Sequence, residues 1–221
     1  MSRQVNFDLL ARPYRWLEYM TFGPWLERCR GAQLAHLTGA RRALLLGDGD
    51  GRFLAQLLAA HPNLTVDVVD SSPAMLRILD QRMRRAGRET GICLHHANAL
   101  EWNPSGRYDL IISHFFLDCF FPHQLDQLCE RVIPHALPGA QWVISEFAIP
   151  RNSIAAYAAR GIIALLYRSF GLLTGLPVRA LPDYTILLRR RGLLLNCERR
   201  YLAGLLTSQV WTLPTSTAKM N

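Results

Sequence analysis

Three glycines at alternate positions, Gly47, Gly49 and Gly51, follow a run of apolar residues at 43–46. Such a run is typical of a strand that is buried on both faces, as in a parallel sheet. Because a glycine carries no Cβ, the backbone can turn sharply at these positions and approach a ligand closely. A helix that begins after Gly51 would direct its unpaired N–H groups and the positive end of its dipole toward the turn. The stretch therefore predicts a strand, a ligand-binding turn and a helix.

The spacing in the sequence between this turn and the next acidic strand end is also informative. Residues 64–70 form a second strand-like run, rich in β-branched side chains, that ends on Asp70. An acidic residue about 20 residues beyond a glycine-rich turn can reach a ribose hydroxyl in nucleotide-binding βαβ units. Ser72 and Pro73 then provide an N-cap and a first helical turn for a helix expected over 72–86.

The spacing of the glycines differs from the dinucleotide fingerprint G-x-G-x-x-G/A. The third glycine comes one residue early, and Arg52 stands where that fingerprint has Gly or Ala. Asp48 and Asp50 would repel phosphates, but they suit a sulfonium and an ammonium cation. These features favour a nucleoside without phosphates, and the structural alternative is a strand-to-helix turn that binds no ligand.

The stretches 44–53 and 69–76 resemble the first two motifs of the class I S-adenosylmethionine-dependent methyltransferases, and are closest to the small-molecule branch with the quinone-ring methylases. The resemblance implies S-adenosylmethionine as cofactor, with the glycines along its methionine part and ribose and Asp70 on the ribose hydroxyls. Asn98 would meet the adenine, where the family usually has an acidic residue. The full set of cofactor-binding residues expected from it is Tyr14, Gly47, Asp48, Gly49, Gly51, Asp70, Ser71, Met75, Asn98, Ala99 and His114.

His114 and Asp118 are the candidate catalytic residues, because they follow a predicted strand at 108–113. Ligands of open parallel sheets bind at the carboxyl ends of the strands. Methyl transfer to an anionic nucleophile mainly needs alignment, whereas a neutral hydroxyl needs a base, for which His114 is the candidate. The alternatives are a loop histidine and a helix cap. Glu146 ends a strand expected over 141–147 on the same side, where the alternative is a surface or capping residue.

The order of elements predicts an α/β fold with a Rossmann-like, seven-stranded, mostly parallel sheet, an antiparallel last strand and helices on both faces. We expect a single methyltransferase domain of four parts. They are an N-terminal helical cap (1–40), a cofactor-binding core (41–150), a helical insertion or lid (151–182) and a C-terminal helix with a strand hairpin (183–221). Long apolar helices are expected within 5–38, with Gly39 as a C-cap, and over 154–176.

Composition limits the classes of partner. The net charge of +8, from 25 basic and 17 acidic residues, leaves weak contact with an anionic membrane surface open, but no aromatic side chains alternate with the basic ones, so nucleic acid is not expected. The five cysteines lack C-x-x-C spacing, and the adjacent His95 and His96 would point to opposite faces of a strand, so no metal site is expected. With no apolar signal core near Met1, we expect a cytoplasmic protein with reduced thiols and no obligate protein partner.

The sequence thus predicts methyl transfer from S-adenosylmethionine to a small, hydrophobic or aromatic acceptor, because apolar residues would wall the site and cover it. Two alternatives remain open at this point. One is a non-enzymatic interaction or membrane-associated protein on the same fold, since fold does not fix function. The other is a nicotinamide-dependent reductase, which Arg52 and the two aspartates of the turn disfavour.

Overall fold

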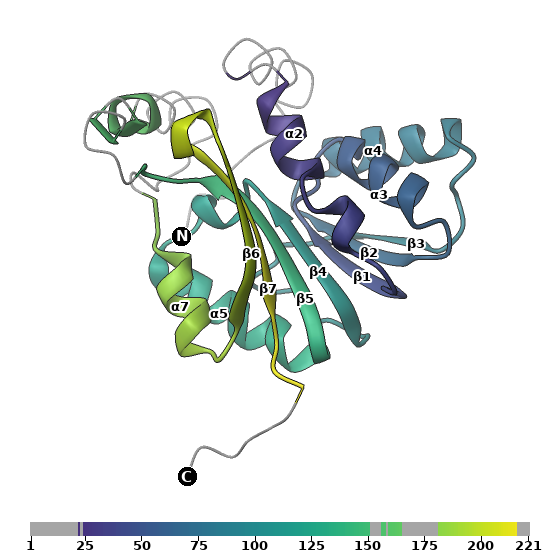
Figure 1. Cartoon of the computed structure of the whole chain (residues 1–221). Coiled ribbons are helices and arrows are strands. Elements are labelled where there is room, and N and C mark those ends of the chain that lie inside the picture. Colours follow the sequence, from purple (N-terminus) through teal and green to yellow (C-terminus); the bar gives the residue numbers. More distant parts are fainter. Residues whose placement is uncertain (1–21, 23, 151–155, 158, 165–180, 216–221) are drawn as a thin grey trace, which may run out of the picture.

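One seven-stranded sheet organises the fold (Figure 1), which a computed structural model describes for residues 22, 24–150, 156–157, 159–164 and 181–215. Its strands lie in the order β3-β2-β1-β4-β5-β7-β6. They are β1 (Arg42–Leu46), β2 (Thr65–Asp70), β3 (Ile92–His96), β4 (Tyr108–His114), β5 (Ala136–Phe147), β6 (Leu194–Tyr201) and β7 (Leu206–Thr212). The predicted α/β fold with a Rossmann-like, mostly parallel sheet is confirmed.

The direction of the strands fixes where a ligand can lie. β1 pairs in parallel with both β2 and β4, and β7 runs antiparallel to β5 and β6. The chain leaves β1 for β2 on one side and later returns to β4 on the other, so the strand order reverses between β1 and β4. In open α/β sheets ligands bind beyond the carboxyl ends of the strands at this reversal, which here means beyond Leu46 and His114.

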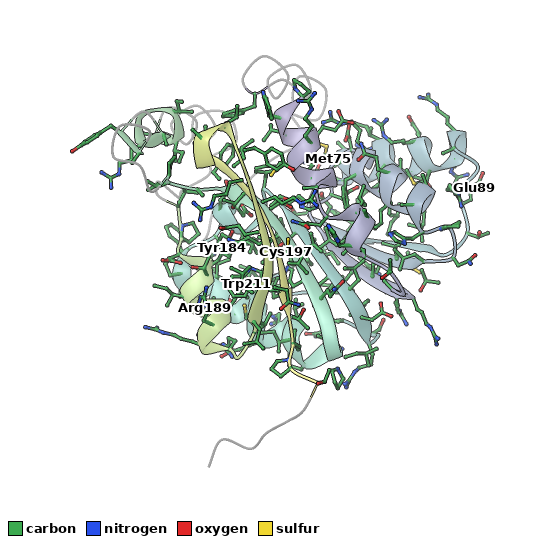
Figure 2. All side chains as sticks on the ribbon, viewed as in Figure 1. Met75, Glu89, Tyr184, Arg189, Cys197 and Trp211 are labelled. Carbon is green, nitrogen blue, oxygen red and sulfur yellow. The ribbon has the colours of Figure 1, made fainter. Side chains whose placement is uncertain are left out.

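Helices cover both faces of the sheet. On one side lie α3 (Arg52–Ala60) and α4 (Pro73–Arg85), while α5 (Pro122–Val132) and α7 (Tyr184–Arg190) lie on the other (Figure 1). Each face has its own cluster of buried apolar side chains, because successive residues of a strand point to opposite faces. Figure 2 shows Tyr184 and Arg189 of α7 beside Trp211 of β7; the Arg189 guanidinium lies 5.4 Å from the Trp211 ring centroid.

A further helix, α2 (Trp25–Gly31), lies near the carboxyl end of the sheet (Figure 1). It is shorter than the apolar pattern up to residue 38 predicts, and a 3-10 turn, η2 (Leu34–His36), follows it. Gly39 has a positive φ but ends no helix, so its prediction as a C-cap is wrong. The side chain of Gln33 donates to the Ser208 carbonyl of β7 at 3.1 Å, a tertiary contact that periodicity cannot foresee.

The fifth strand starts earlier than predicted. The strand expected over 141–147 is β5, which begins at Ala136 and includes the Pro-Gly pair at 138–139. Gly139 has a φ of 79°, and its N–H donates to the Leu213 carbonyl at 3.1 Å. The pairing with β4 shifts register between Tyr108 and Leu110, because the four residues 137–140 of β5 lie between Ala136 and Gln141, the partners of these two residues.

Several expectations concern residues outside the described ranges. Residues 156–157 and 159–164 are helical, in accord with the helix expected over 154–176, but the rest of that helix, most of the proposed lid and Tyr14 lie outside the described residues. None of the helices that the structure describes is long and apolar enough to cross a membrane.

Candidate functional site

The glycine turn joins β1 to α3 and has the conformation that its residues predict. Gly47, Gly49 and Gly51 have φ values of 68°, 66° and 77°, in the left-handed region that residues with a Cβ rarely adopt. A Cβ at Gly51 would lie 2.7 Å from Cγ of Leu79, so this glycine lets α3 begin against α4. A Cβ at Gly49 would meet nothing within 4 Å, which leaves space beside the turn.

Asp70 ties the end of β2 to this turn. Its Oδ2 accepts the backbone N–H of Gly49 at 3.3 Å, and its Oδ1 accepts the N–H of Ser72 at 2.8 Å. The Ser72 hydroxyl in turn accepts the N–H of Met75 at 3.2 Å and caps α4 as predicted. One carboxylate therefore joins the glycine turn to the start of the next helix, at the carboxyl ends of β1 and β2.

The two aspartates inside the turn have different surroundings. Burial raises the pKa of Asp48 to about 8, although the N–H of Leu54 donates to this carboxyl at 3.4 Å. Asp50 instead forms ion pairs with Arg52 at 3.0 Å and Arg82 at 3.1 Å. The expectation that both carboxylates suit a cationic ligand is therefore wrong for Asp50, which is neutralised by two arginines and holds the turn to α4.

The predicted adenine contacts lie after β3. The Asn98 amide oxygen accepts the N–H of Leu100 at 3.1 Å, and its amide nitrogen donates to Glu101 at 3.2 Å. Ser71 is exposed, but the side chains of Met75 and Ala99 are buried, with 6% and 7% exposed. Met75 and Ala99 therefore offer apolar surface rather than polar groups.

His114, at the end of β4, is buried with 8% of its surface exposed. Its ring stands edge-on to Phe53 of α3, with 4.4 Å between the centroids. Within the described part of the chain neither ring nitrogen has a hydrogen-bond partner. Burial, together with the positive charge of Arg30, holds the pKa of His114 well below its usual range, so the ring is neutral at pH 7.

Asp118 lies in a short 3-10 turn, η3 (Leu117–Cys119), directly after β4. The carboxyl group of Glu146 packs beneath this turn and is fully buried. Its Oε1 accepts the N–H groups of Phe116 at 2.9 Å and Leu117 at 2.7 Å. Burial and the charge of Asp118 raise the pKa of Glu146 well above its usual range. Glu146 therefore lies on the ligand side of the sheet, as expected, and caps the turn that carries Asp118.

Sequence patterns did not single out Arg30. This residue of α2 lies over the ring of Phe115, 5.2 Å from its centroid, and its charge acts on both Asp48 and His114. α2 is held there by polar contacts, since the Ser145 hydroxyl donates to the Cys29 carbonyl at 3.2 Å. A basic residue in the last turn of a helix is commonly exposed to solvent, so the sequence alone does not indicate a role for Arg30. Only the packing of α2 in the fold shows where Arg30 lies.

Side chains that bind metal ions do not gather in one place within the described ranges. No group of three or more His, Cys, Asp or Glu side chains in the described ranges could hold a metal ion. His95 and His96 have separate partners, since His95 bonds Asp67 at 2.8 Å and His96 bonds the Ser71 carbonyl at 3.2 Å.

Comparison with known proteins agrees with this geometry. Residues 44–141 match a family model described as a methyltransferase domain. The chain is 30% identical over 156 residues to trans-aconitate 2-methyltransferase of Mycobacterium ulcerans, an alignment that covers 69% of this chain and 56% of that protein. The chain thus spans little more than half the length of this curated relative.

Solved structures share the fold. An O-methyltransferase family protein from Burkholderia thailandensis superposes with a TM-score of 0.71 at 17% identity, over 93% of this chain and 60% of that one. The N-methyltransferase NodS from Bradyrhizobium japonicum, in complex with S-adenosyl-L-homocysteine, gives a TM-score of 0.62 at 17% identity, over 86% of this chain and 88% of that one.

Proposed function

We propose that this chain, which carries a class I S-adenosylmethionine-dependent methyltransferase domain, transfers the methyl group of that cofactor to a small-molecule acceptor. The observation that carries the proposal is the bond between Asp70 and Gly49, which joins the carboxylate at the end of β2 to a turn of three left-handed glycines. A Cβ at Gly49 would meet nothing within 4 Å, so space for a ligand lies beside this carboxylate.

The residues around the turn fit the cofactor. Gly47, Gly49 and Gly51 border its methionine part and ribose, and Asp70 accepts from the ribose hydroxyls. Asn98 keeps a second lone pair on its amide oxygen for the adenine amino group. Ser71, Met75 and Ala99 line the same edge. For Tyr14, which lies outside the described residues, we also propose a contact with the cofactor.

Charged groups suit the amino-acid end of the cofactor, which carries a carboxylate and an ammonium. Arg30 supplies a positive charge and Asp48 a titratable carboxyl at the same end of β1. The ionised form of Asp48 is costly in the free protein because of burial. A bound ammonium would offset that cost, because an opposite charge nearby favours the carboxylate.

When bound, S-adenosylmethionine supplies an electrophilic methyl group on a sulfonium. The chain's main contribution is to hold donor and acceptor in line. His114, which has no partner among the described residues, can accept the proton of a hydroxyl acceptor, although burial lowers the pKa of its ring and so weakens it as a base. Asp118 lies on the turn that follows His114, where it can orient the acceptor.

The surroundings favour a hydrophobic or aromatic acceptor over a polyanion. Aromatic rings gather after β4 and β5, with Phe115 and Phe22 each about 5 Å from Phe147 between ring centroids. Burial and the charge of Asp118 raise the pKa of Glu146 beneath the turn that carries Asp118, so a further negative charge is costly beside this turn. That cost disfavours a tricarboxylate such as trans-aconitate, which the name of the mycobacterial relative gives as its substrate.

Calorimetric titration with S-adenosylmethionine, S-adenosylhomocysteine and NADH tests the proposal. We expect micromolar binding of the two sulfur nucleosides, loss of that binding in Asp70→Ala, and no binding of NADH. Asp80→Ala is the matched control, because Asp80 is an exposed carboxylate of α4 that pairs only with Arg84 among the described residues. Failure of the folded wild-type protein to bind either nucleoside would refute the proposal.

Methyl transfer to a panel of acceptors tests the proposed acceptor class and the role of His114. Hydrophobic phenols should be methylated in preference to trans-aconitate. His114→Gln should lower kcat with a hydroxyl acceptor by about a hundredfold, the usual contribution of a general base, but should change kcat little with a thiolate acceptor. An equal loss with both acceptors would exclude the role of base.

A further inference from the structure

Glu146 satisfies backbone groups that would otherwise be buried without partners. Its carboxyl group is 0% exposed, and one oxygen accepts the N–H groups of both Phe116 and Leu117. Buried N–H groups cost about 1–3 kcal/mol each when unpaired, so this side chain helps to hold the shape of the turn after β4.

That turn needs support because its first residue is strained. Phe115 has a φ of 51°, in the left-handed region that disfavours residues with a Cβ. The N–H of Phe115 donates to the Ser145 carbonyl at 2.7 Å. Strained residues persist where neighbouring structure holds them. Here β5 holds the turn twice, through the Ser145 backbone and through the Glu146 side chain.

The turn after β4 lies against the glycine turn after β1. A Cβ placed on Gly47 would lie 2.3 Å from Cδ2 of Phe116, so the Phe116 ring lies directly on this glycine. The same ring stands edge-on to Phe120, with 4.9 Å between centroids. Burial, together with the charges of Asp118 and Asp70, raises the pKa of Cys119 well above its usual range.

We propose that Glu146 is a positioning residue for the methyl donor: through the amides of Phe116 and Leu117 it holds the Phe116 ring against Gly47 as a wall of the donor site. This inference rests on the proposed function. It assigns Glu146 no contact with the donor and no proton transfer, and it makes the shape of the turn, rather than the charge of Glu146, the quantity that matters.

Two other roles for Glu146 make different predictions. If Glu146 acted as an acid or base, Glu146→Gln would lower kcat. If its charge attracted the sulfonium, Glu146→Gln would weaken binding of S-adenosylmethionine but not of S-adenosylhomocysteine, whose sulfur is neutral. A positioning role requires only an acceptor oxygen, which glutamine retains.

The test compares Glu146→Gln, Glu146→Leu and Phe116→Ala by calorimetric titration with both nucleosides, with thermal unfolding to establish that each variant is folded. We expect Glu146→Gln to keep both dissociation constants within about twofold, and Glu146→Leu to weaken both by about tenfold, or 1.4 kcal/mol. Phe116→Ala should weaken both similarly, and the double variant Glu146→Leu/Phe116→Ala should add little, because the two residues act through one contact.

Asp67→Asn is the matched control, because Asp67 is also a buried carboxylate that accepts several hydrogen bonds. It should lower the unfolding temperature and leave donor affinity unchanged.

Unchanged affinity in folded Glu146→Leu would overturn the inference, and so would weakened binding in Glu146→Gln. If Glu146→Leu does not fold, Phe116→Ala decides instead, and unchanged affinity there would also overturn it. Absence of binding by the wild-type protein would refute the proposed function, and this inference with it, whereas the variants bear on the inference alone.

Discussion

The ring of Phe116 occupies the space that a side chain at Gly47 would need, with Cδ2 only 2.3 Å from the position of the missing Cβ. The first glycine of the turn thus serves two requirements at once. Its φ of 68° lets the chain leave β1, and its lack of a Cβ lets the loop after β4 close on the loop after β1. The loops that follow β1 and β4, the two strands on either side of the reversal in strand order, are therefore in contact.

Gly47→Ala should be more harmful than an alanine at an equally left-handed glycine without neighbours. Gly87→Ala is the matched control, because its φ is 63° and a Cβ there would meet nothing within 4 Å. We expect the control to cost about 1 kcal/mol of unfolding free energy and to leave donor binding intact. Gly47→Ala should cost more and weaken S-adenosylhomocysteine binding by at least about tenfold. Chemical denaturation and calorimetry measure the two effects, and equal behaviour of the two variants would contradict the role given to Phe116.

His114 should make stability depend on pH below neutrality. Its folded-state pKa lies well below the ordinary 6.5, so the unfolded chain binds the proton first as the pH falls. Unfolding free energy should therefore decrease below about pH 6.5, by at most about 1.4 kcal/mol per pH unit from this group. Urea denaturation of wild type and His114→Gln between pH 7.5 and pH 5 should show the smaller decrease in the variant. Parallel curves would show that folding does not lower the pKa of this ring.

Glu146 should make the unfolding free energy depend on pH in the opposite direction. Burial, with the charge of Asp118, raises its pKa well above the ordinary 4.5, so the folded state keeps a proton that the unfolded chain releases. The protein should lose stability from this group as the pH rises above about 4.5. Glu146→Gln removes this titration, so the stability of the variant relative to wild type should increase between pH 5 and pH 8. A constant difference across that range, measured by thermal or urea unfolding, would contradict the raised pKa.

Asp67 should contribute stability away from the donor-binding edge. Burial acts to raise its pKa, but hydrogen bonds from His95, Arg42 and Tyr108 outweigh burial and lower it. Stability from this carboxylate is present above the ordinary pKa of 3.8 and is lost as the pH falls through the lowered folded-state value. Asp67→Asn should cost about 1–3 kcal/mol at pH 7, and less after acidification. The exposed Asp80→Asn should cost little, and equal losses in the two variants would refute this role.

The sequence by itself determined the sheet, the glycine turn and the carboxylate that meets it. Four apolar residues, alternate glycines and Asp70 at the end of the next strand are local patterns, and each is imposed by backbone geometry within a few residues. The N-cap at Ser72 and the antiparallel hairpin of β6 and β7 could be predicted for the same reason.

Only the tertiary structure decided which polar groups pair. Asp48 and Asp50 both flank Gly49 in the turn, yet Asp50 pairs with Arg82 from α4 while Asp48 accepts the N–H of Leu54. The approach of Arg30 through the docking of α2, and the support that Glu146 gives to Phe116, join residues far apart along the chain. Such contacts depend on how helices and loops pack across the carboxyl edge of the sheet, and local periodicity carries no information about that packing.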